Sequence, residues 1–219
     1  MEQQIGDVSL EDNVKSKYLK VSRMHYTQGG RKKCWDIAES HDSVACLIFH
    51  RHRKCFLLVK QFRPPVYLKH KRILDNEQMQ FDPWQQNLAK QKEPSGFSFE
   101  LCAGLCDKSG ATPVKVCQEE IEEECGYAVD VLAIEFVNHY YQSVGTSAAV
   151  QYLFYVEVDE TMKLDGKGGG LEAEGEQIEL VELPLSELQQ FMNDNSKVRT
   201  PAALFALMWW KAHKAQLHQ

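Results

Sequence analysis

A short acidic stretch constrains this chain more than any other feature. Five of the six residues from Glu119 to Glu124 are glutamates. The residues around them carry the signals of a helix, because Thr112 suits the N-cap, Pro113 suits the first helical position, and Gly126 stands just past the end. The sequence therefore predicts a short helix that carries an unusual density of negative charge.

This helix has an apolar edge and an acidic edge. At about 100° per residue, one apolar stripe that packs on a core is formed by Val114, Cys117, Ile121 and Cys125. Glu120 and Glu124 lie one turn apart beside the stripe, and Glu123 sits next to them. Three carboxylates therefore converge on one edge of a helix that is anchored by its other edge.

Such crowding admits two interpretations. Like charges at i,i+4 spacing destabilise a helix, and acids near its C-terminal end oppose the macrodipole. The ordinary interpretation is a solvated acidic face. The alternative is a hard divalent cation such as Mg²⁺, which takes oxygen ligands and joins carboxylates to substrate phosphates. The surrounding residues favour the cation.

The stretch resembles the Nudix box, whose pattern is GX5EX7REUXEEXGU with U an aliphatic or bulky apolar residue. The matching residues are Gly104, Glu120, Ile121, Glu123, Glu124, Gly126 and Tyr127. There are three departures: one extra residue lies between Gly104 and the helix, the first glutamate of the pattern falls on Ala111, and its arginine falls on Glu119. The preceding Glu-Leu-Cys-Ala-Gly resembles the E-x-x-A-G strand of the nucleoside-diphosphosugar branch.

The resemblance implies a fold, a reaction and a metal site. The fold is an α/β/α sandwich with a mixed sheet, preceded by a β-hairpin. The reaction is Mg²⁺-dependent hydrolysis of a diphosphate, with Mn²⁺ as a substitute. By resemblance the metal ligands are Glu120, Glu124 and the main-chain carbonyl of Ala103, while Glu123 completes or shares the site and serves in catalysis.

The arginine position raises a separate question. In the family this arginine braces the box glutamates by ion pairing, whereas Glu119 adds repulsion one turn from Glu123. Three outcomes stay open: Lys115, one turn before Glu119, partly substitutes; an extra metal does; or activity is weakened. We expect the metal-free protein to be destabilised at this helix.

A second motif lies in the segment QFRPPVY, residues 61–67. Its two prolines end a strand and hold Arg63 extended at the strand end. There a guanidinium can grip a diphosphate bidentately or pair with a carboxylate. QFRPP resembles the segment of ADP-ribose and UDP-sugar pyrophosphatases in which this arginine contacts substrate. Glu100 likewise resembles a position near substrate or metal, with a structural hydrogen bond as the alternative.

A glycine-rich segment, DGKGGGLEAEGE, spans residues 165–176. It is not a P-loop, because it lacks the GK[ST] ending between a strand and a helix. Its acids Glu174 and Glu176 resemble the E-x-E-x-I motif, in which a glutamate on a mobile loop acts as general base. A glycine-hinged loop can swing a base in and exclude solvent. Glu176 is slightly favoured over Glu174.

One residue bears on the substrate. ADP-ribose pyrophosphatases of this family show Ser-Pro-Gly about fifteen residues past the box, whereas this chain has Val144 between Ser143 and Gly145. We therefore predict hydrolysis of a UDP-sugar, most like UDP-glucose, to UMP and glucose 1-phosphate. The alternatives are an ADP-ribose pyrophosphatase, which shares the other motifs, and a catalytically weak Nudix-fold binding protein, motivated by Ala111 and Glu119.

The remaining sequence suggests three parts. Residues 1–16 are polar and expected to be flexible. Residues 17–42 read as a strand hairpin around Gln28-Gly29-Gly30, and the resemblance implies that it serves dimerisation. Residues 43–219 form the Nudix domain, with a polar insertion at 68–96 read as a surface excursion and a charged turn at 51–54 read as a solvated tip.

Composition excludes several classes of partner. A net charge of −6 argues against a nucleic-acid or anionic-membrane surface. The N-terminus has no apolar h-region, and no run approaches the roughly 18 apolar residues of a membrane span. Seven cysteines without framework spacing favour reduced thiols in the cytosol. We expect a cytoplasmic homodimer that takes a nucleotide sugar and binds neither nucleic acid nor membrane.

Overall fold

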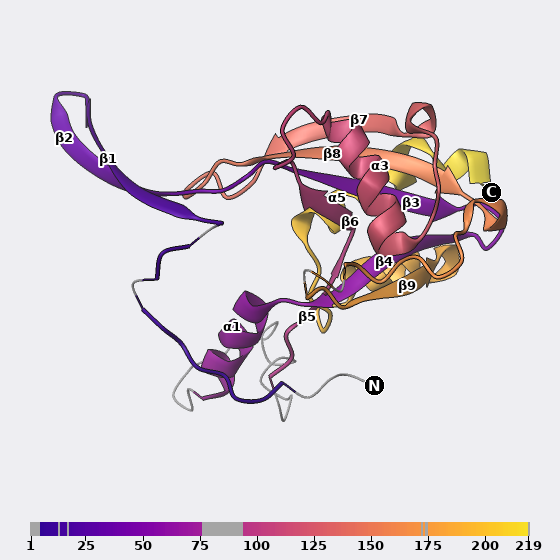
Figure 1. Cartoon of the computed structure of the whole chain (residues 1–219), viewed down its shortest axis with the longest axis horizontal. Coiled ribbons are helices and arrows are strands. Elements are labelled where there is room, and N and C mark those ends of the chain that lie inside the picture. The colour runs from indigo at the N-terminus through magenta and orange to yellow at the C-terminus, as the bar shows by residue number, and fades with distance from the viewer. Residues whose placement is uncertain are drawn as a thin grey trace. The chain divides into compact units, whose positions relative to one another are not determined.

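The computed structural model describes residues 5–218, apart from 13, 17, 76–93, 172 and 174. The chain divides into two compact units (Figure 1). The first consists of Met1–His41 with Tyr141–Ala149. The second consists of Asp42–Tyr140 with Val150–Gln219.

The first unit is built on the predicted hairpin. Strand β1 (Lys20–Gln28) pairs antiparallel with β2 (Arg31–Glu39). Gly29 and Gly30 have φ values of 57° and 74°, which a tight two-residue hairpin turn requires at both positions. Segment 141–149 binds β2, because the Trp35 indole N–H donates to the carbonyl of Gly145 over 2.7 Å.

The second unit contains a mixed sheet. Its main path runs β5-β4-β3-β8-β7, while β6 also pairs with β3 and β9 with β4. The β3–β8 pair is parallel, whereas β3 and β4 pair antiparallel with their other registered partners. The strands are β3 (Ser43–His50), β4 (Cys55–Phe62), β5 (Phe97–Glu100), β6 (Cys102–Leu105), β7 (Glu135–Tyr141), β8 (Val150–Val158) and β9 (Ile178–Pro184).

Helices cover both faces of this sheet, which confirms the predicted α/β/α fold. One core contains the side chains of α3 (Pro113–Glu120) and the π-helical turn η1 (Ile121–Cys125). The other core contains those of α4 (Leu188–Asn193) and α5 (Pro201–His213). Figure 1 shows α3 lying across the strands. The short 3-10 helices are η2 (Val131–Ala133), η3 (Glu160–Met162), η5 (Leu185–Glu187) and η6 (Ala215–His218).

Strand β3 explains why the sequence shows an unbroken apolar run. Alternate residues of a strand point to opposite faces. The α3 core accordingly contains Val44, Cys46 and Ile48, while the α5 core contains Ala45, Leu47 and Phe49. Because both faces are buried, no polar residue interrupts the run from Val44 to Phe49.

Helix α1 (Pro64–Leu74) was not predicted. Arg63 is extended, with φ −117° and ψ 105°, as expected, and its carbonyl accepts from the N–H groups of Val66 and Tyr67. The two prolines therefore end the strand and also start a helix, because the first helical turn does not need their missing N–H groups. The central part of the expected insertion, 76–93, lies outside the described residues.

The turn at residues 51–54 is more than the solvated tip expected from the sequence. Arg53 donates to Glu160 over 2.8 Å and to the Tyr127 hydroxyl over 3.2 Å, and it also pairs with Glu182. The sequence could not show this, because the partners lie more than seventy residues away. Within the described part of the chain, no helix is both long and apolar enough to cross a membrane.

The two threonine caps provide a test of these helices. The Thr200 hydroxyl accepts from the Ala203 N–H at the start of α5, whereas at the start of α3 no described backbone N–H donates to the Thr112 side chain. We predict that Thr200→Ala lowers the free energy of unfolding by about 1 kcal/mol. Thr112→Ala is the matched control and should cost clearly less in urea denaturation. Equal losses would contradict the difference in capping.

Candidate active site

The helix α3–η1 ends in a π turn rather than in the regular turn assumed from the sequence. Ile121–Cys125 has π geometry, and Gly126 follows it in the left-handed conformation at φ 70°. A wider turn changes the direction of the side chains it carries. Glu124, expected beside the apolar stripe, is only 3% exposed. The box helix thus buries a carboxylate together with its apolar edge.

Strand β6 receives this buried carboxylate. The Ala103 N–H donates to Glu124 Oε2 over 2.9 Å. In an extended strand the N–H and the C=O of one residue point to the same side, so the Ala103 carbonyl faces this carboxylate edge as well. The resemblance implied a ligand role for that carbonyl, and its direction suits the role.

Glu120 lies directly against the strand that enters the box. A Cβ atom at Gly104 would stand 2.6 Å from Glu120 Cγ and would collide with the carboxylate. Gly104 therefore leaves room beside the strand for the Glu120 carboxylate. Burial raises the pKa of Glu120 to about 8. Three neighbouring carboxylates add to this rise: Glu124, Glu123 and Glu176.

Glu124 is perturbed in the same direction. Burial raises its pKa to about 7, and the Ala103 N–H and the Cys102 thiol oppose this rise. The charges of Glu176 and Glu100 add to it. Two carboxylates whose burial and mutual repulsion disfavour the charged form make a site that a cation would stabilise.

The glycine-rich loop is bound to the end of the box helix. Gly169 N–H donates to the Glu124 carbonyl over 2.9 Å, and Gly170 N–H donates to the Glu123 carbonyl over 3.1 Å. The Lys163 ammonium donates to the Cys125 carbonyl over 2.8 Å. The last carbonyls of a helix have no partner within the helix. The loop supplies those partners, and these bonds fix the loop against the end of the helix.

This loop carries one of the two expected bases to the site. The Glu176 carboxylate accepts from the Leu171 N–H over 3.0 Å, and it lies close enough to Glu120 and Glu124 to raise their pKa values. Glu174, the other candidate, lies outside the described residues.

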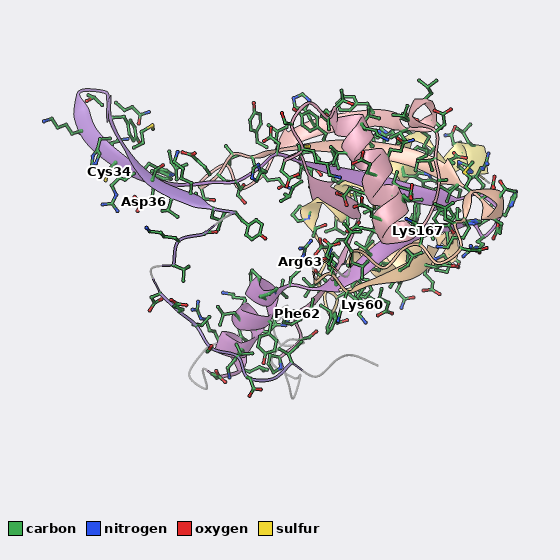
Figure 2. The ribbon with its side chains drawn as sticks, viewed as in Figure 1. Cys34, Asp36, Lys60, Phe62, Arg63 and Lys167 are labelled. Carbon is green, nitrogen blue, oxygen red and sulfur yellow. The ribbon has the colours of Figure 1, made fainter. Side chains whose placement is uncertain are left out.

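Arg63 and Glu100 pair with one another. Arg63 Nε and Nη2 donate to the two oxygens of Glu100, both over 2.8 Å, and the Ser98 hydroxyl donates to Glu100 as well. Burial alone would raise the pKa of Glu100, but these bonds outweigh burial and lower it. The Arg63 side chain is still 45% exposed where β4 passes into α1 (Figure 2).

Arg63 also interacts electrostatically with the carboxylate cluster. Its pKa is raised by hydrogen bonding to Glu100 and further by the charges of Glu124 and Glu176. Both interpretations of Arg63 from the sequence therefore remain compatible. It is paired with a carboxylate, and its exposed part lies within electrostatic reach of the candidate metal ligands.

The donors suit a hard divalent cation. Glu120, Glu123, Glu124 and the Ala103 carbonyl offer oxygen atoms only, and their mutual repulsion gives a cation something to neutralise. Among the described residues, no group of three side chains already stands at metal-binding spacing. The carboxylates would have to close around the ion.

Sequence reasoning missed one participant. Lys108, in the loop before α3, donates to Glu119 Oε2 over 2.7 Å. Lys115, one of the three possibilities left open by the sequence, stands 3.8 Å from Glu119. No local signal in the sequence marks this contact, because it joins a loop to a helix across eleven residues.

The raised pKa values predict how stability depends on pH. Between about pH 4.5 and 8 the folded protein binds more protons at Glu120 and Glu124 than the unfolded chain does, so metal-free stability falls as pH rises. Melting temperatures in chelator should drop across this range more steeply for wild type than for Glu124→Gln. Adding Mg²⁺ should raise the melting temperature more at pH 8 than at pH 5. Parallel pH curves for the two proteins would contradict the assignment.

Comparisons with known proteins agree with this geometry. No protein-family model matches the sequence. Uridine diphosphate glucose pyrophosphatase NUDT14 from Bos taurus is 36% identical over 205 residues, covering 89% of each chain. The protein of that name from Mus musculus is 34% identical over the same shares. GDP-mannose pyrophosphatase from Pectobacterium atrosepticum is 32% identical over 73% of this chain and 67% of its own. With the box core on α3–η1 and relatives spanning most of its length, the chain belongs to the Nudix family, in the branch of the nucleotide-sugar pyrophosphatases.

Proposed function

We propose that this protein is a Mg²⁺-dependent hydrolase of UDP-sugars, which cleaves UDP-glucose to UMP and glucose 1-phosphate. The observation that carries the proposal is the pair of crowded carboxylates Glu120 and Glu124 at the β6 strand, with pKa values raised to about 8 and 7. The two relatives named for UDP-glucose cover the chain nearly from end to end.

The residues divide into three roles. Glu120, Glu124 and the Ala103 carbonyl would hold the metal, and Glu123 would complete or share that site. When bound, Mg²⁺ supplies charge neutralisation for the diphosphate and lowers the pKa of the attacking water. Mn²⁺, with the same preference for oxygen ligands, is the expected substitute.

Arg63 and Glu100 act on the substrate side. The bidentate pair fixes the plane of the guanidinium, so that its exposed part is already oriented when a diphosphate arrives. Glu100 is therefore a positioning residue for Arg63, and Arg63 is the phosphate-binding residue.

Glu176 is the proposed general base. Its loop is held to the helix through Gly169 and Gly170, while Gly170 and Gly175 have left-handed backbone conformations on either side of the segment that leads to the carboxylate. Loss of the bond from the Leu171 N–H would free the Glu176 carboxylate to accept a proton from water. Glu174 is the alternative base and should be tested in parallel.

The hairpin of residues 17–42 is proposed as the dimer interface, joined to a Nudix domain at 43–219. A lone two-stranded hairpin is at best marginally stable in water. Here the cross-strand pair Met24 and Trp35 is about half exposed on one face of the hairpin. Contact with a second copy would cover this apolar surface. Seven free cysteines, most of them buried, are in keeping with the reducing cytoplasm.

A product assay with a matched control tests the reaction. Purified protein with Mg²⁺ should convert UDP-glucose to UMP and glucose 1-phosphate, separated by chromatography. Glu124→Gln should lower kcat by at least about 100-fold, because it removes a buried ligand of the metal that activates water. Glu122→Gln is the control: Glu122 is on the same turn but is half exposed and paired with Lys167, so activity should be nearly unchanged.

The substrate panel separates the alternatives. GDP-mannose and ADP-ribose should be hydrolysed with clearly lower kcat/KM than UDP-glucose. Faster formation of GMP or AMP would reassign the substrate while keeping the enzyme class. If none of the three turns over although each binds, the protein is instead a catalytically weak binding protein.

The dimer proposal has its own test. Met24→Glu places a charge on the exposed hairpin face, and burying that charge between two subunits would be costly. We predict that wild type sediments as a dimer and that Met24→Glu shifts it toward monomer. Thr27→Glu, on the opposite face by register, is the control. A monomeric wild type would rule out this interface.

A further inference from the structure

The loop between β6 and α3 holds a lysine against the acidic helix. Its start is fixed by the bond from the Cys106 N–H to the Asp42 carbonyl over 2.8 Å, and a turn joins the Ala111 N–H to the Lys108 carbonyl over 3.2 Å. From this turn Lys108 Nζ donates to Glu119 Oε2 over 2.7 Å. The contact is between a loop and a helix.

The competing cation is placed less well. Lys115 Nζ stands 3.8 Å from Glu119 Oε1 and donates instead to the side chain of Gln118 over 2.9 Å. The hydrogen bond of Lys115 is therefore to Gln118 and not to Glu119. Lys108 is the principal partner of Glu119 among the described residues.

Lys108 also lies at the edge of the carboxylate cluster. Its pKa is raised chiefly by the bond to Glu119, and the charges of Glu123 and Glu120 add to this rise. In return, Lys108 opposes the rise in the pKa of Glu120. One ammonium group thus interacts with three glutamates of the same helix.

Two departures from the Nudix pattern complement each other here. The pattern has a basic residue on the helix where this chain has Glu119, and this chain has one extra residue in the loop that carries Lys108. In this chain the positive charge is on the loop, at Lys108, and not on the helix at the position of Glu119. As an exposed ion pair the contact stabilises the fold only slightly. Its importance lies in where it holds the Glu119 carboxylate.

We propose that Lys108 is a positioning residue that binds and neutralises the Glu119 carboxylate at the edge of the cluster, so that Glu119 neither joins nor crowds the ligands of the metal. The inference rests on the proposed function, because those residues are its metal ligands. Without Lys108, the carboxylate of Glu119 is free to turn toward the same ion.

The test uses the full chain and five variants: Lys108→Met, Lys115→Met, Glu119→Gln, the double variant K108M/E119Q and the charge swap K108E/E119K. Lys115→Met is the matched control, since it removes the same charge from the other lysine near Glu119. Mn²⁺ binding is followed by electron paramagnetic resonance without nucleotide, and kcat and KM are measured with Mg²⁺ and UDP-glucose.

The proposal predicts opposite changes in the affinity for Mn²⁺ and in the affinity for UDP-glucose. Lys108→Met should bind Mn²⁺ about fivefold more tightly, because a free carboxylate is gained, while KM for UDP-glucose rises about fivefold, because negative charge is added beside an anionic substrate. Lys115→Met should change the Mn²⁺ affinity and the KM by less than about half as much as Lys108→Met does. The double variant should match Glu119→Gln, and the charge swap should restore most of the wild-type KM.

Several results would overturn the proposal. They are weaker Mn²⁺ binding in Lys108→Met, as a merely structural role predicts; equal effects of Lys108→Met and Lys115→Met; or an undiminished effect of Lys108→Met in the Glu119→Gln background. The Mn²⁺ measurement needs no nucleotide. If wild type leaves UDP-glucose intact while the Mn²⁺ pattern holds, the proposed substrate fails and the role of Lys108 toward the metal ligands stands.

Discussion

The structure depends on how one negatively charged helix end is accommodated in the interior. The end of α3–η1 combines one buried carboxylate, that of Glu124, with main-chain carbonyls that have no partner in the helix. Each receives a donor from elsewhere: Ala103 N–H binds the side chain of Glu124, and the loop N–H groups of Gly169 and Gly170 bind the last carbonyls. A strand and a distant loop are therefore joined at this point, and the candidate site forms where they meet.

The core beneath the site is fitted to this arrangement. Five buried cysteines lie in the core between the sheet and α3–η1: Cys46, Cys55, Cys102, Cys117 and Cys125. Burial raises the pKa of Cys46 and Cys102 well above its usual value, so these thiols act as small apolar groups rather than as nucleophiles. Their small side chains fit the core between the helix and the sheet. Bulkier residues would push the carboxylates away from β6.

Local signals predicted much of this from sequence. Pro113 and Gly126 mark the ends of the box helix as expected, and the N-terminal hairpin turns at Gly29 and Gly30 as predicted, because turns and caps act over short distances. The misses depend on distant contacts. The helix begun by Pro64 and the pairing of Lys108 require knowledge of what packs nearby. The buried direction of Glu124 depends on a π turn, which a fixed 100° periodicity cannot represent.

The attachment of the glycine-rich loop to the helix has a thermodynamic consequence. The same segment contributes Glu176 and completes the helix that presents Glu120 and Glu124. Any nucleotide that rearranges the loop on binding must also change the affinity of those carboxylates for their cation. By linkage, the cation changes the affinity for the nucleotide by an equal factor. Through the bonds of Gly169 and Gly170, the two ligands of the site can be cooperative without touching one another.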